Sequence, residues 1–514
     1  MTATFTHPRH VAKRHPDRAA VVMAGGESLS YAELVRRADQ TAQLFRALGV
    51  GPGETVAFLI ENSVRMAELC WAAKNSGLYY VCIATHLTAN EVAYIIDNSE
   101  ARLIVTSRKL AELVEGIDPA IAQVSIDGDA GRARDYAAAL AEQPATPIPG
   151  ARRGASMLYS SGTTGRPKGV RMAIEDVAPE APPRRQAMLV DAFGFGPGMV
   201  FVNPAPLYHV APLRMMMAVQ RLGGTAIIFP RFEPEAVLDA IDRYRATHAS
   251  LVPIMFVRLL RLPESVRARY SLGSLRVVVH SAAPCPADVK RRMLQWWGPV
   301  IHEIYGGTEG IGHTIIGPQE WLAHPGSVGR CPPGCEIEIR DATGQSLPPG
   351  ETGRIFFRNA ARFSYFKDAG KTTEAVCPDG FATYGDIGRI DRDGYLFLTD
   401  RASHMIISGG VNIYPQETEE VLLCHPGISD AAVIGIPDAE YGERVKAIVE
   451  PFAMPADAQS LAAEITAFCR TRLSPIKCPR AIEFVESLPR NELGKIAKHV
   501  LRDRYARSAD ATSG

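Results

Sequence analysis

The stretch Tyr159-Ser160-Ser161-Gly162-Thr163-Thr164-Gly165-Arg166-Pro167-Lys168-Gly169 decides which fold this chain is expected to adopt. Its glycines let the backbone approach a ligand closely and present N–H groups, and its hydroxyls add further donors. Lys168 adds a positive charge suited to phosphate. The spacing is not that of a Walker A loop. Clusters of Gly, Ser and Thr are usually plain surface loops, but so long a specific string is rare in one, and we interpret it as a phosphate-binding loop.

Predicted strands and helices alternate on both sides of this loop. Ser30 and Glu33 have the spacing of a capping box, and the apolar stripe that follows predicts a helix ending at Gly49. Short apolar runs predict buried strands at Thr55–Ile60, Tyr79–Ala84, Leu103–Val105, Ala226–Phe229 and Val277–Val279. Strands that alternate with helices indicate the α/β class, with layers built on parallel sheets.

Two later segments differ from this pattern. Residues 335–398 contain short strands and turns such as Asp391-Arg392-Asp393-Gly394, which are typical of an antiparallel subdomain. Beyond Leu398 the pattern predicts a small α+β unit, with a helix at Leu461–Leu473 and strands at Ala431–Ile436, Lys446–Pro451 and Ala481–Val485. We therefore predict two domains, a large one over residues 1–402 and a small one over residues 403–514.

Length and composition limit the function classes. At 514 residues the chain is too long for a single hydrophobic core, and 46% hydrophobic with 22% charged residues is typical of a globular protein. Basic and acidic residues number 56 each, so no net charge draws the chain to nucleic acid or to an acidic membrane. No secretory signal is visible at the start, and no apolar run is long enough for a transmembrane helix. The nine cysteines lack the spacing of a zinc site or a disulfide framework, so we expect reduced thiols and a cytoplasmic protein.

At the quoted loop the chain resembles the adenylate-forming superfamily, which contains acyl- and aryl-CoA ligases, luciferases and the adenylation domains of peptide synthetases. The resemblance extends from about Tyr31 to Arg502 and follows the family's order of motifs. The further segments that carry it are Pro206-Leu207-Tyr208-His209, His280-Ser281-Ala282-Ala283-Pro284, Tyr305-Gly306-Gly307-Thr308-Glu309, Tyr384-Gly385-Asp386, Asp400-Arg401 and Leu488-Pro489-Arg490-Asn491-Glu492-Leu493-Gly494-Lys495. Matches in this number and order exclude coincidence.

The resemblance implies an ATP-dependent ligase that converts a carboxylic acid to acyl-AMP and then to acyl-CoA, with ATP, Mg²⁺ and coenzyme A as cofactors. A carboxylic acid, with a pKa of about 4–5, is already an anionic nucleophile at neutral pH, so no general base is required. The carboxylate must instead approach the α-phosphate of a highly anionic nucleotide. Such a site needs cations, oriented N–H groups and a metal.

Individual roles for the nucleotide contacts also come from the resemblance. Tyr305 is expected to stack on adenine, and Asp386 is expected to accept from the ribose hydroxyls, with Arg401 beside the same sugar. The residues expected to bind ATP or AMP are Ser160, Ser161, Gly162, Thr163, Thr164, Gly165, Lys168, Ala282, Ala283, Pro284, Tyr305, Gly306, Gly307, Thr308, Asp386, Arg401 and Lys495.

The catalytic and metal-binding residues follow in the same way. Glu309 is expected to hold Mg²⁺ together with the hydroxyl of Ser160, and Thr308 to contact the α-phosphate. Lys495 is expected to stabilise the charge that develops between the α-phosphate and the attacking carboxylate. His209 completes the expected catalytic set as a gate to the acyl pocket, and a histidine satisfied within the core is its alternative.

The second half-reaction uses a thiol. A thiol with a pKa of about 8.5 supplies enough thiolate at neutral pH to attack a mixed anhydride without a strong base. In this family the small domain rotates after adenylation, which withdraws Lys495 and brings a CoA-binding loop, here Ser408-Gly409-Gly410, beside the pantetheine. The hinge falls at Ser403, where relatives commonly carry Asp or Lys. Serine tolerates φ/ψ change, so we expect rotation to persist with altered timing.

The acyl pocket implied by the resemblance is mostly apolar, which favours a fatty or other bulky hydrophobic acid over acetate. Arg214 is the exception. It either pairs with a second carboxylate or lies at the pocket edge with its charge toward solvent. The residues expected to line the pocket are His209, Pro212, Leu213, Met216, Val252, Phe256, Gly307 and Ile311.

Several alternatives stay open at this stage. The acid could be aryl, alicyclic or steroid-like, and the acceptor could be the pantetheine of a carrier protein, although no carrier domain follows Arg502. A luciferase-like oxygenase shares only the first step. A non-catalytic nucleotide-binding protein is disfavoured because the expected catalytic residues are intact. The sequence leaves the oligomeric state open, with a homodimer as one option.

Overall fold

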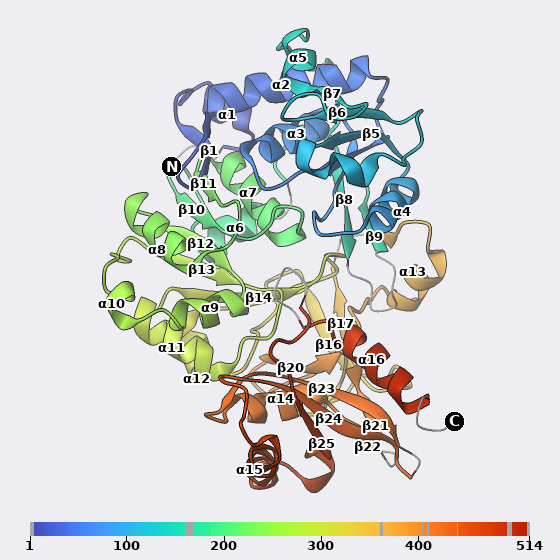
Figure 1. Ribbon diagram of the computed structural model, residues 1–514. Coiled ribbons are helices and arrows are strands. Elements are labelled where there is room, and N and C mark those ends of the chain that lie inside the picture. The colour runs from blue at the N-terminus through green and yellow to red at the C-terminus, as the bar shows by residue number, and fades with distance from the viewer. Residues whose placement is uncertain are drawn as a thin grey trace.

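The computed structural model describes residues 5–160, 168–183, 186–359, 363–401, 404–408, 411–438, 440–490 and 496–510. Figure 1 shows a large body that carries the chain from its N-terminus through the yellow segments, and a smaller orange and red part below it. The α/β fold class is confirmed. The domain boundary near residue 402 lies beside residues outside the described part of the chain and stays a prediction.

The first large sheet has eight strands in the order β15-β14-β13-β12-β10-β11-β1-β2. The six strands from β14 to β1 run parallel, and β15 and β2 pair antiparallel at the two edges. The strands are β1 Ala19–Met23, β2 Ser28–Ser30, β10 Val200–Asn203, β11 Thr225–Ile228, β12 His248–Leu251, β13 Val277–His280, β14 Ile301–Gly306 and β15 His313–Ile316.

The second large sheet also has eight strands, in the order β18-β9-β8-β4-β3-β5-β6-β7. The strands from β8 to β7 run parallel, whereas β9 and β18 add an antiparallel edge. The strands are β3 Thr55–Leu59, β4 Tyr79–Cys82, β5 Ala101–Thr106, β6 Ala122–Ser125, β7 Arg134–Asp135, β8 Ala155–Ser160, β9 Lys168–Met172 and β18 Phe363–Tyr365.

The predicted antiparallel subdomain is a four-stranded sheet in the order β16-β17-β19-β20. Its strands are β16 Glu336–Arg340, β17 Gly353–Arg358, β19 Asp386–Ile390 and β20 Leu396–Arg401. The C-terminal unit holds a separate sheet of β21 Ile406–Ser408, β22 Val411–Ile413, β23 Ile428–Asp438, β24 Gly442–Pro451 and β25 Ala481–Phe484. This unit also carries the helices α14 Pro415–Leu423, α15 Ala458–Arg470 and α16 Lys498–Asp510 and the 3₁₀ turn η3 Pro475–Lys477.

Helices cover the two large sheets (Figure 1). The predicted capping box is present, with Ser30 accepting from the N–H of Glu33 at the start of α2. No helix among the described residues is both long and apolar enough to cross a bilayer. The remaining helices and 3₁₀ turns are α1 Pro8–Ala12, α2 Tyr31–Ala47, α3 Val64–Asn75, α4 Ala89–Ser99, η1 Arg108–Val114, α5 Tyr136–Ala141, α6 Gln186–Phe193, α7 Val210–Leu222, α8 Pro234–Arg243, α9 Pro253–Leu260, α10 Glu264–Arg267, α11 Ala287–Trp297, α12 Pro318–Ala323 and α13 Ala369–Ala375.

The largest apolar core lies between the two parallel sheets and fixes α7 in place. Tyr31 of α2 donates to the carbonyls of Gln220 at 2.9 Å and Gly224 at 2.7 Å. Trp71 of α3 donates from its indole N–H to the side-chain oxygen of Gln220 at 2.7 Å. These bonds satisfy buried polar groups, so three helices form one rigid unit that carries the wall of the site described next.

Candidate functional site

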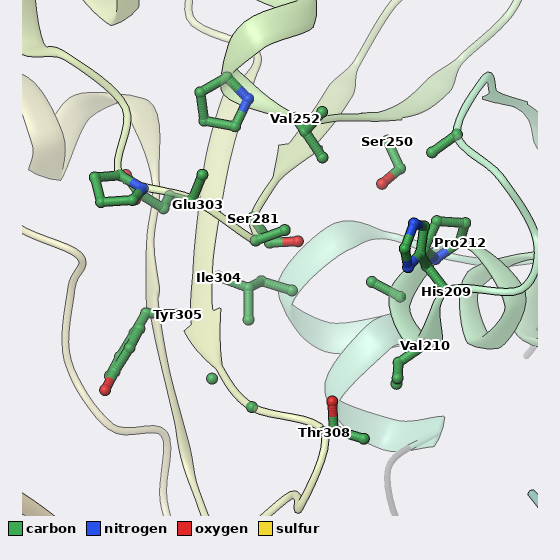
Figure 2. A pocket seen from close by; sticks show the side chains of 18 of the residues that line it. His209, Val210, Pro212, Ser250, Val252, Ser281, Glu303, Ile304, Tyr305 and Thr308 are labelled. Atoms are coloured by element: carbon green, nitrogen blue, oxygen red, sulfur yellow. The ribbon is translucent and has the colours of Figure 1, made fainter. Parts of the chain in front are cut away.

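One large cavity, of about 2630 Å³, opens where the parallel strands end. The segments that follow the carboxyl ends of β10, β12, β13 and β14 all contribute to its wall, which is the usual place for a ligand in open α/β sheets. In Figure 2, His209, Val210 and Pro212 lie on one side of the view and Tyr305 on the other, with Ser281 and Ile304 between them. The structure therefore brings together segments that are far apart in sequence.

Tyr305 and Asp386 meet on one side of the cavity. The phenol of Tyr305 donates to Oδ2 of Asp386 at 2.6 Å, and the ring of Tyr305 lies 6.2 Å from that of Tyr384 in an edge-on arrangement. Asp386 faces Arg401 across the β19–β20 ladder, and the side chain of Arg401 lies outside the described part. An aromatic ring next to a carboxylate suits a base and its ribose.

The backbone of the Gly306-Gly307 turn comes very close to the ring of Tyr384. A Cβ at Gly307 would lie 2.5 Å from Cδ1 of Tyr384 and 2.8 Å from Oε2 of Glu309, so only glycine fits. Ala282, in the segment after β13, has a φ of 79°, a left-handed value that is strained for alanine. Ser281, Ala282, Ala283 and Pro284 all line the cavity.

A group of charged residues lies at the entrance of β9. Lys168 begins this strand, and its ammonium lies 5.5 Å from the ring of Tyr365, whose phenol donates to Oε1 of Glu309 at 2.8 Å. Burial and then the neighbouring Lys371 lower the pKa of Lys168, while nearby carboxylates oppose this effect. Thr308 also lines the cavity. A cation and an oriented carboxylate at one place suit a polyphosphate with its metal.

Sequence reasoning missed Tyr365 and Lys371. Both come from the segment of β18 and α13, about 60 residues beyond the motif that contains Glu309, and neither stands in a pattern of its own. The pairing of β18 with β9 brings Tyr365 beside Val170, and this long-range contact left no local signal.

Several expected residues lie outside the described part of the chain. The phosphate-loop residues Ser161, Gly162, Thr163, Thr164 and Gly165 do so, as do the hinge residue Ser403, the CoA-loop residues Gly409 and Gly410, and Lys495. Ser160 ends β8, but its side chain is not described. Arg490 and Ile496, which stand on either side of the stretch with Lys495, both line the cavity.

Half of the residues expected in the acyl pocket line this cavity. His209, Pro212, Val252 and Gly307 do line the cavity, and His209 lies directly before the first residue of α7 with its ring 4.6 Å from that of Tyr208. Four other expected lining residues do not reach the cavity wall, because they point into the apolar core, where they are at most 3% exposed. They are Leu213, Met216, Phe256 and Ile311.

Ser408, the described residue of the expected CoA-binding loop, is also away from the cavity. It is buried in β21, where its backbone pairs with Val411 and Gly442. In this arrangement Ser408 is not part of the cavity wall, whereas the C-terminal unit contributes Glu419, Asp430 and residues near position 496 to that wall.

A buried ion pair supports the strand that carries Tyr305. Lys290 of α11 donates to Oε2 of Glu303 at 2.6 Å, and Nε2 of His280 lies 3.3 Å from the same oxygen. Burial alone raises the pKa of Glu303, but His280 and Lys290 outweigh it and lower the pKa to about 2. Glu303 is therefore ionised, and its position two residues before Tyr305 fixes the end of β14 against α11.

Comparison with known proteins agrees with this geometry. The family model described as AMP-binding enzyme matches residues 8–365, and that of the AMP-binding enzyme C-terminal domain matches residues 417–495. A feruloyl-CoA synthase of Amycolatopsis is 33% identical over 500 residues, covering 96% of this chain and 97% of its own. The long-chain-fatty-acid–CoA ligase FadD13 of Mycobacterium tuberculosis is 31% identical, covering 93% of each chain. The ATP-bound structure of MatB from Rhodopseudomonas palustris superposes with a TM-score of 0.85 at 31% identity, covering 97% of this chain and 99% of MatB.

Proposed function

This chain belongs to the AMP-binding enzyme family and is an acid–thiol ligase, and from that premise we propose that it activates a hydrophobic carboxylic acid with ATP and transfers the acyl group to coenzyme A. The reaction has two steps. The carboxylate oxygen attacks the α-phosphorus of ATP, and pyrophosphate leaves. The thiol sulfur of CoA then attacks the acyl carbon, AMP leaves, and the thiol proton passes to solvent.

The adenosine part is proposed to bind between Tyr305, the Ala283-Pro284 segment and Asp386. One oxygen of Asp386 already accepts from Tyr305 at 2.6 Å, which holds the carboxylate in one orientation. A carboxylate has lone pairs enough to accept from both ribose hydroxyls as well. Arg401, directly opposite Asp386 in the β19–β20 ladder, is proposed to contact the same sugar.

The triphosphate is proposed to lie against the loop 160–168. Lys168 supplies positive charge at the end of this loop. Its ammonium lies 5.5 Å from the ring of Tyr365, whose phenol donates to Glu309, so Lys168 and Glu309 both lie near Tyr365. Mg²⁺ prefers carboxylate and phosphate oxygens, and Glu309, oriented by Tyr365, fits this preference, with Ser160 proposed as its second protein ligand. When bound, the metal neutralises phosphate charge. Thr308 and Lys495 are proposed to contact the α-phosphate.

The acid is proposed to enter past His209 and to lie along α7. The residues of α7 that face the cavity before Arg214 are the apolar Val210, Ala211 and Pro212, and Val252 adds to the same wall. Because this surface is apolar, the transfer of an apolar acyl chain from water to it is favourable in free energy. A fatty acyl chain is our first choice for the body of the substrate, with aryl and alicyclic bodies as alternatives.

Thioester formation is proposed to need a second arrangement of the C-terminal unit. Ser408 lies away from the cavity here, and rotation about Ser403 would carry Ser408, Gly409 and Gly410 to the acyl-adenylate. Lys495 would leave the site in the same motion. The two half-reactions would then use opposite faces of the small unit.

The observation that carries the proposal is the meeting of Tyr305, Asp386, Glu309 and Lys168 around one cavity. The test is pyrophosphate release by the purified protein with a panel of fatty, aromatic, alicyclic and dicarboxylic acids, with and without CoA. We expect acid-dependent pyrophosphate release, acyl-AMP when CoA is omitted, and acyl-CoA when it is present. Pyrophosphate release without any thioester would refute CoA as acceptor, and no pyrophosphate with any acid would refute the ligase activity.

A further inference from the structure

Four cationic side chains gather in the inner part of the cavity, away from the nucleotide residues. Lys74 lies in the last turn of α3, Arg153 precedes β8, and Arg214 and Arg221 belong to α7. All four line the cavity, with Arg153 and Arg221 buried and the other two half-buried. We call these residues the inner cationic cluster. Cations are seldom buried in proteins without an anion, so this cluster requires an explanation.

The carboxylates of the protein balance only part of this charge. Arg153 is paired with Glu175 and donates to the carbonyl of Ala181 at 2.7 Å. Arg221 donates to the carbonyl of Thr6 at 2.5 Å and lies 5.0 Å from the ring centre of Trp71. Within the described ranges, no carboxylate stands at ion-pair distance from Lys74 or Arg221. The cluster therefore keeps an excess of positive charge.

The electrostatic effect of this excess is visible on two members. Burial and then repulsion by Arg221, Arg153 and Arg214 lower the pKa of Lys74 to about 7. Burial and repulsion by Arg153 lower the pKa of Arg221 to about 10. An anion placed among the four groups would raise the pKa of both Lys74 and Arg221.

Helix α7 connects the cluster to the expected reaction centre. His209 caps its start, and the rise of an α-helix carries Arg214 about 7.5 Å and Arg221 about 18 Å further along the axis. The remaining α7 residues that line the cavity are apolar, namely Val210, Ala211, Pro212, Met215, Met217, Ala218 and Leu222. A ligand that starts at His209 therefore meets apolar residues of α7 first and positive charge from Arg214 onward.

The nucleotide cannot supply that charge. The N–H of Gly154 donates to the carbonyl of Lys74 at 2.8 Å, so the amino end of β8 adjoins the cluster. The phosphate-binding loop begins at the other end of β8, and an extended strand from Ala155 to Ser160 spans about 17 Å. Phosphates bound by that loop would therefore lie far from Arg153 and Lys74.

We propose that the inner cationic cluster binds a second carboxylate of the acid, so that the preferred substrate is a dicarboxylic acid with an apolar chain between its two ends. The first carboxylate reacts with ATP near Thr308 and His209, and the second is held by Lys74, Arg153, Arg214 and Arg221. This inference rests on the proposed ligase function and names the substrate class of the same site.

The experiment compares α,ω-dicarboxylic acids with monocarboxylic acids of equal chain length in the pyrophosphate-release assay. We expect one range of chain lengths in which kcat/KM for the dicarboxylic acid exceeds that for the monocarboxylic acid at least tenfold. Arg214→Met and Lys74→Met each remove one charge at nearly constant length. Each is expected to lower the ratio of the two kcat/KM values at least tenfold, mainly through KM for the dicarboxylic acid.

The matched control is Arg231→Met, because Arg231 is 82% exposed and lies outside the cavity. Its selectivity ratio should equal that of the wild type. A thermal-shift measurement gives a second readout, in which the dicarboxylic acid raises the Tm of the wild type more than that of Arg214→Met or Lys74→Met.

The cluster proposal and the ligase function can be refuted separately. Faster activation of monocarboxylic acids at every length, with an unchanged ratio in both cluster variants, would overturn the cluster proposal and leave the ligase function intact. Absence of pyrophosphate release with all acids would overturn the ligase function itself. A dicarboxylic preference that survives both cluster variants would show that the second carboxylate binds elsewhere, which also overturns the cluster proposal.

Discussion

The phenol of Tyr305 donates a 2.6 Å hydrogen bond to Oδ2 of Asp386, which joins β14 of a parallel sheet to β19 of the antiparallel subdomain. Asp386 is only 8% exposed. The bond therefore holds a nearly buried carboxylate in one orientation before any ligand arrives. Two motifs that stand about 80 residues apart in the chain thus act as one surface.

Tyr305→Phe should weaken nucleotide binding while leaving the ring in place. A hydrogen bond to a charged group contributes about 1.5–3 kcal/mol, so we expect KM for ATP to rise about tenfold or more and KM for the acid to change little. Initial rates of pyrophosphate release at varied ATP measure this. Tyr395→Phe is the control, since its phenol bonds to Glu320 at 3.1 Å outside the cavity. Equal KM values for ATP in wild type and Tyr305→Phe would contradict the role of the bond.

Gly307→Ala should damage the site through the backbone. The new Cβ would lie 2.5 Å from Cδ1 of Tyr384, so either the ring or the Gly306-Gly307 turn must move. A displacement of about 1 Å next to the reacting groups lowers a rate by about 10²-fold, which is the loss in kcat/KM that we expect for adenylation. In Gly273→Ala no atom lies within 4 Å of the added carbon, so this control variant should keep the wild-type kcat/KM. Full activity of Gly307→Ala would show that the turn can move without loss of kcat/KM, which would contradict the prediction.

The sequence predicted the parallel sheets well because buried strands are short apolar runs with few alternatives. Thr55–Ile60 was expected and β3 spans Thr55–Leu59, and Val277–Val279 was expected where β13 spans Val277–His280. The same logic found the capping box at Ser30, whose chemistry is entirely local. Strand order and the pairing of β18 with β9 depend on distant segments, and no local pattern contains them.

The site was predicted less completely, and α7 explains why. Pro212, Leu213 and Met216 were all expected to line the pocket, but a helix turns only one face toward a cavity. Val210, Ala211 and Arg214 face it, whereas Leu213 and Met216 face the core. The inner cationic cluster was visible only as Arg214, because its other members come from α3, the start of β8 and the end of α7. The zero net charge of the chain conceals such a local excess.

Lys290→Met should destabilise the protein by about 3–5 kcal/mol, because it leaves the buried carboxylate of Glu303 without its main partner. The double variant Lys290→Met/Glu303→Gln removes both charges and should recover most of that loss. Denaturant unfolding of the three proteins measures the difference. Equal stability of Lys290→Met and wild type would mean that His280 alone satisfies Glu303.

The same pair gives a pH dependence. Since His280 and Lys290 lower the pKa of Glu303 to about 2, its contribution to stability is complete above its ordinary pKa of about 4.3 and is lost as pH falls from there toward 2. The Tm of the wild type should therefore fall more steeply than that of the double variant between pH 4.5 and about 2. Parallel curves would contradict this linkage.

The charge on the buried Lys74 should destabilise the folded state, whereas the charge on Glu303 stabilises it. Burial and three arginine neighbours, Arg221, Arg153 and Arg214, lower the pKa of Lys74 to about 7, and Cys70 on the same helix opposes them. The unfolded chain then binds the extra proton between about pH 7 and 10.4, so folded-state stability rises with pH across that range. Lys74→Met lacks this dependence and should melt at a higher temperature than wild type at pH 7, with the gap closing toward pH 9. A wild type that is the more stable at pH 7 would refute the repulsion.

Lys495→Ala should separate the two half-reactions. Arg490 and Ile496, which flank residues 491–495 in the sequence, both line the cavity in which adenylation is proposed to occur. Without Lys495, the charge that develops as the carboxylate attacks the α-phosphate loses a stabilising cation, and we expect pyrophosphate release to fall at least 10²-fold. Thioester formation from supplied acyl-AMP and CoA should persist, because an acyl-adenylate needs no further cation at the phosphate and the proposed rotation removes Lys495 from the site.

Lys477→Ala, which alters a lysine paired with Glu417 in the same unit, controls for loss of a charge alone and should retain both activities. Equal loss of both half-reactions in Lys495→Ala would contradict a mobile lysine that serves adenylation only.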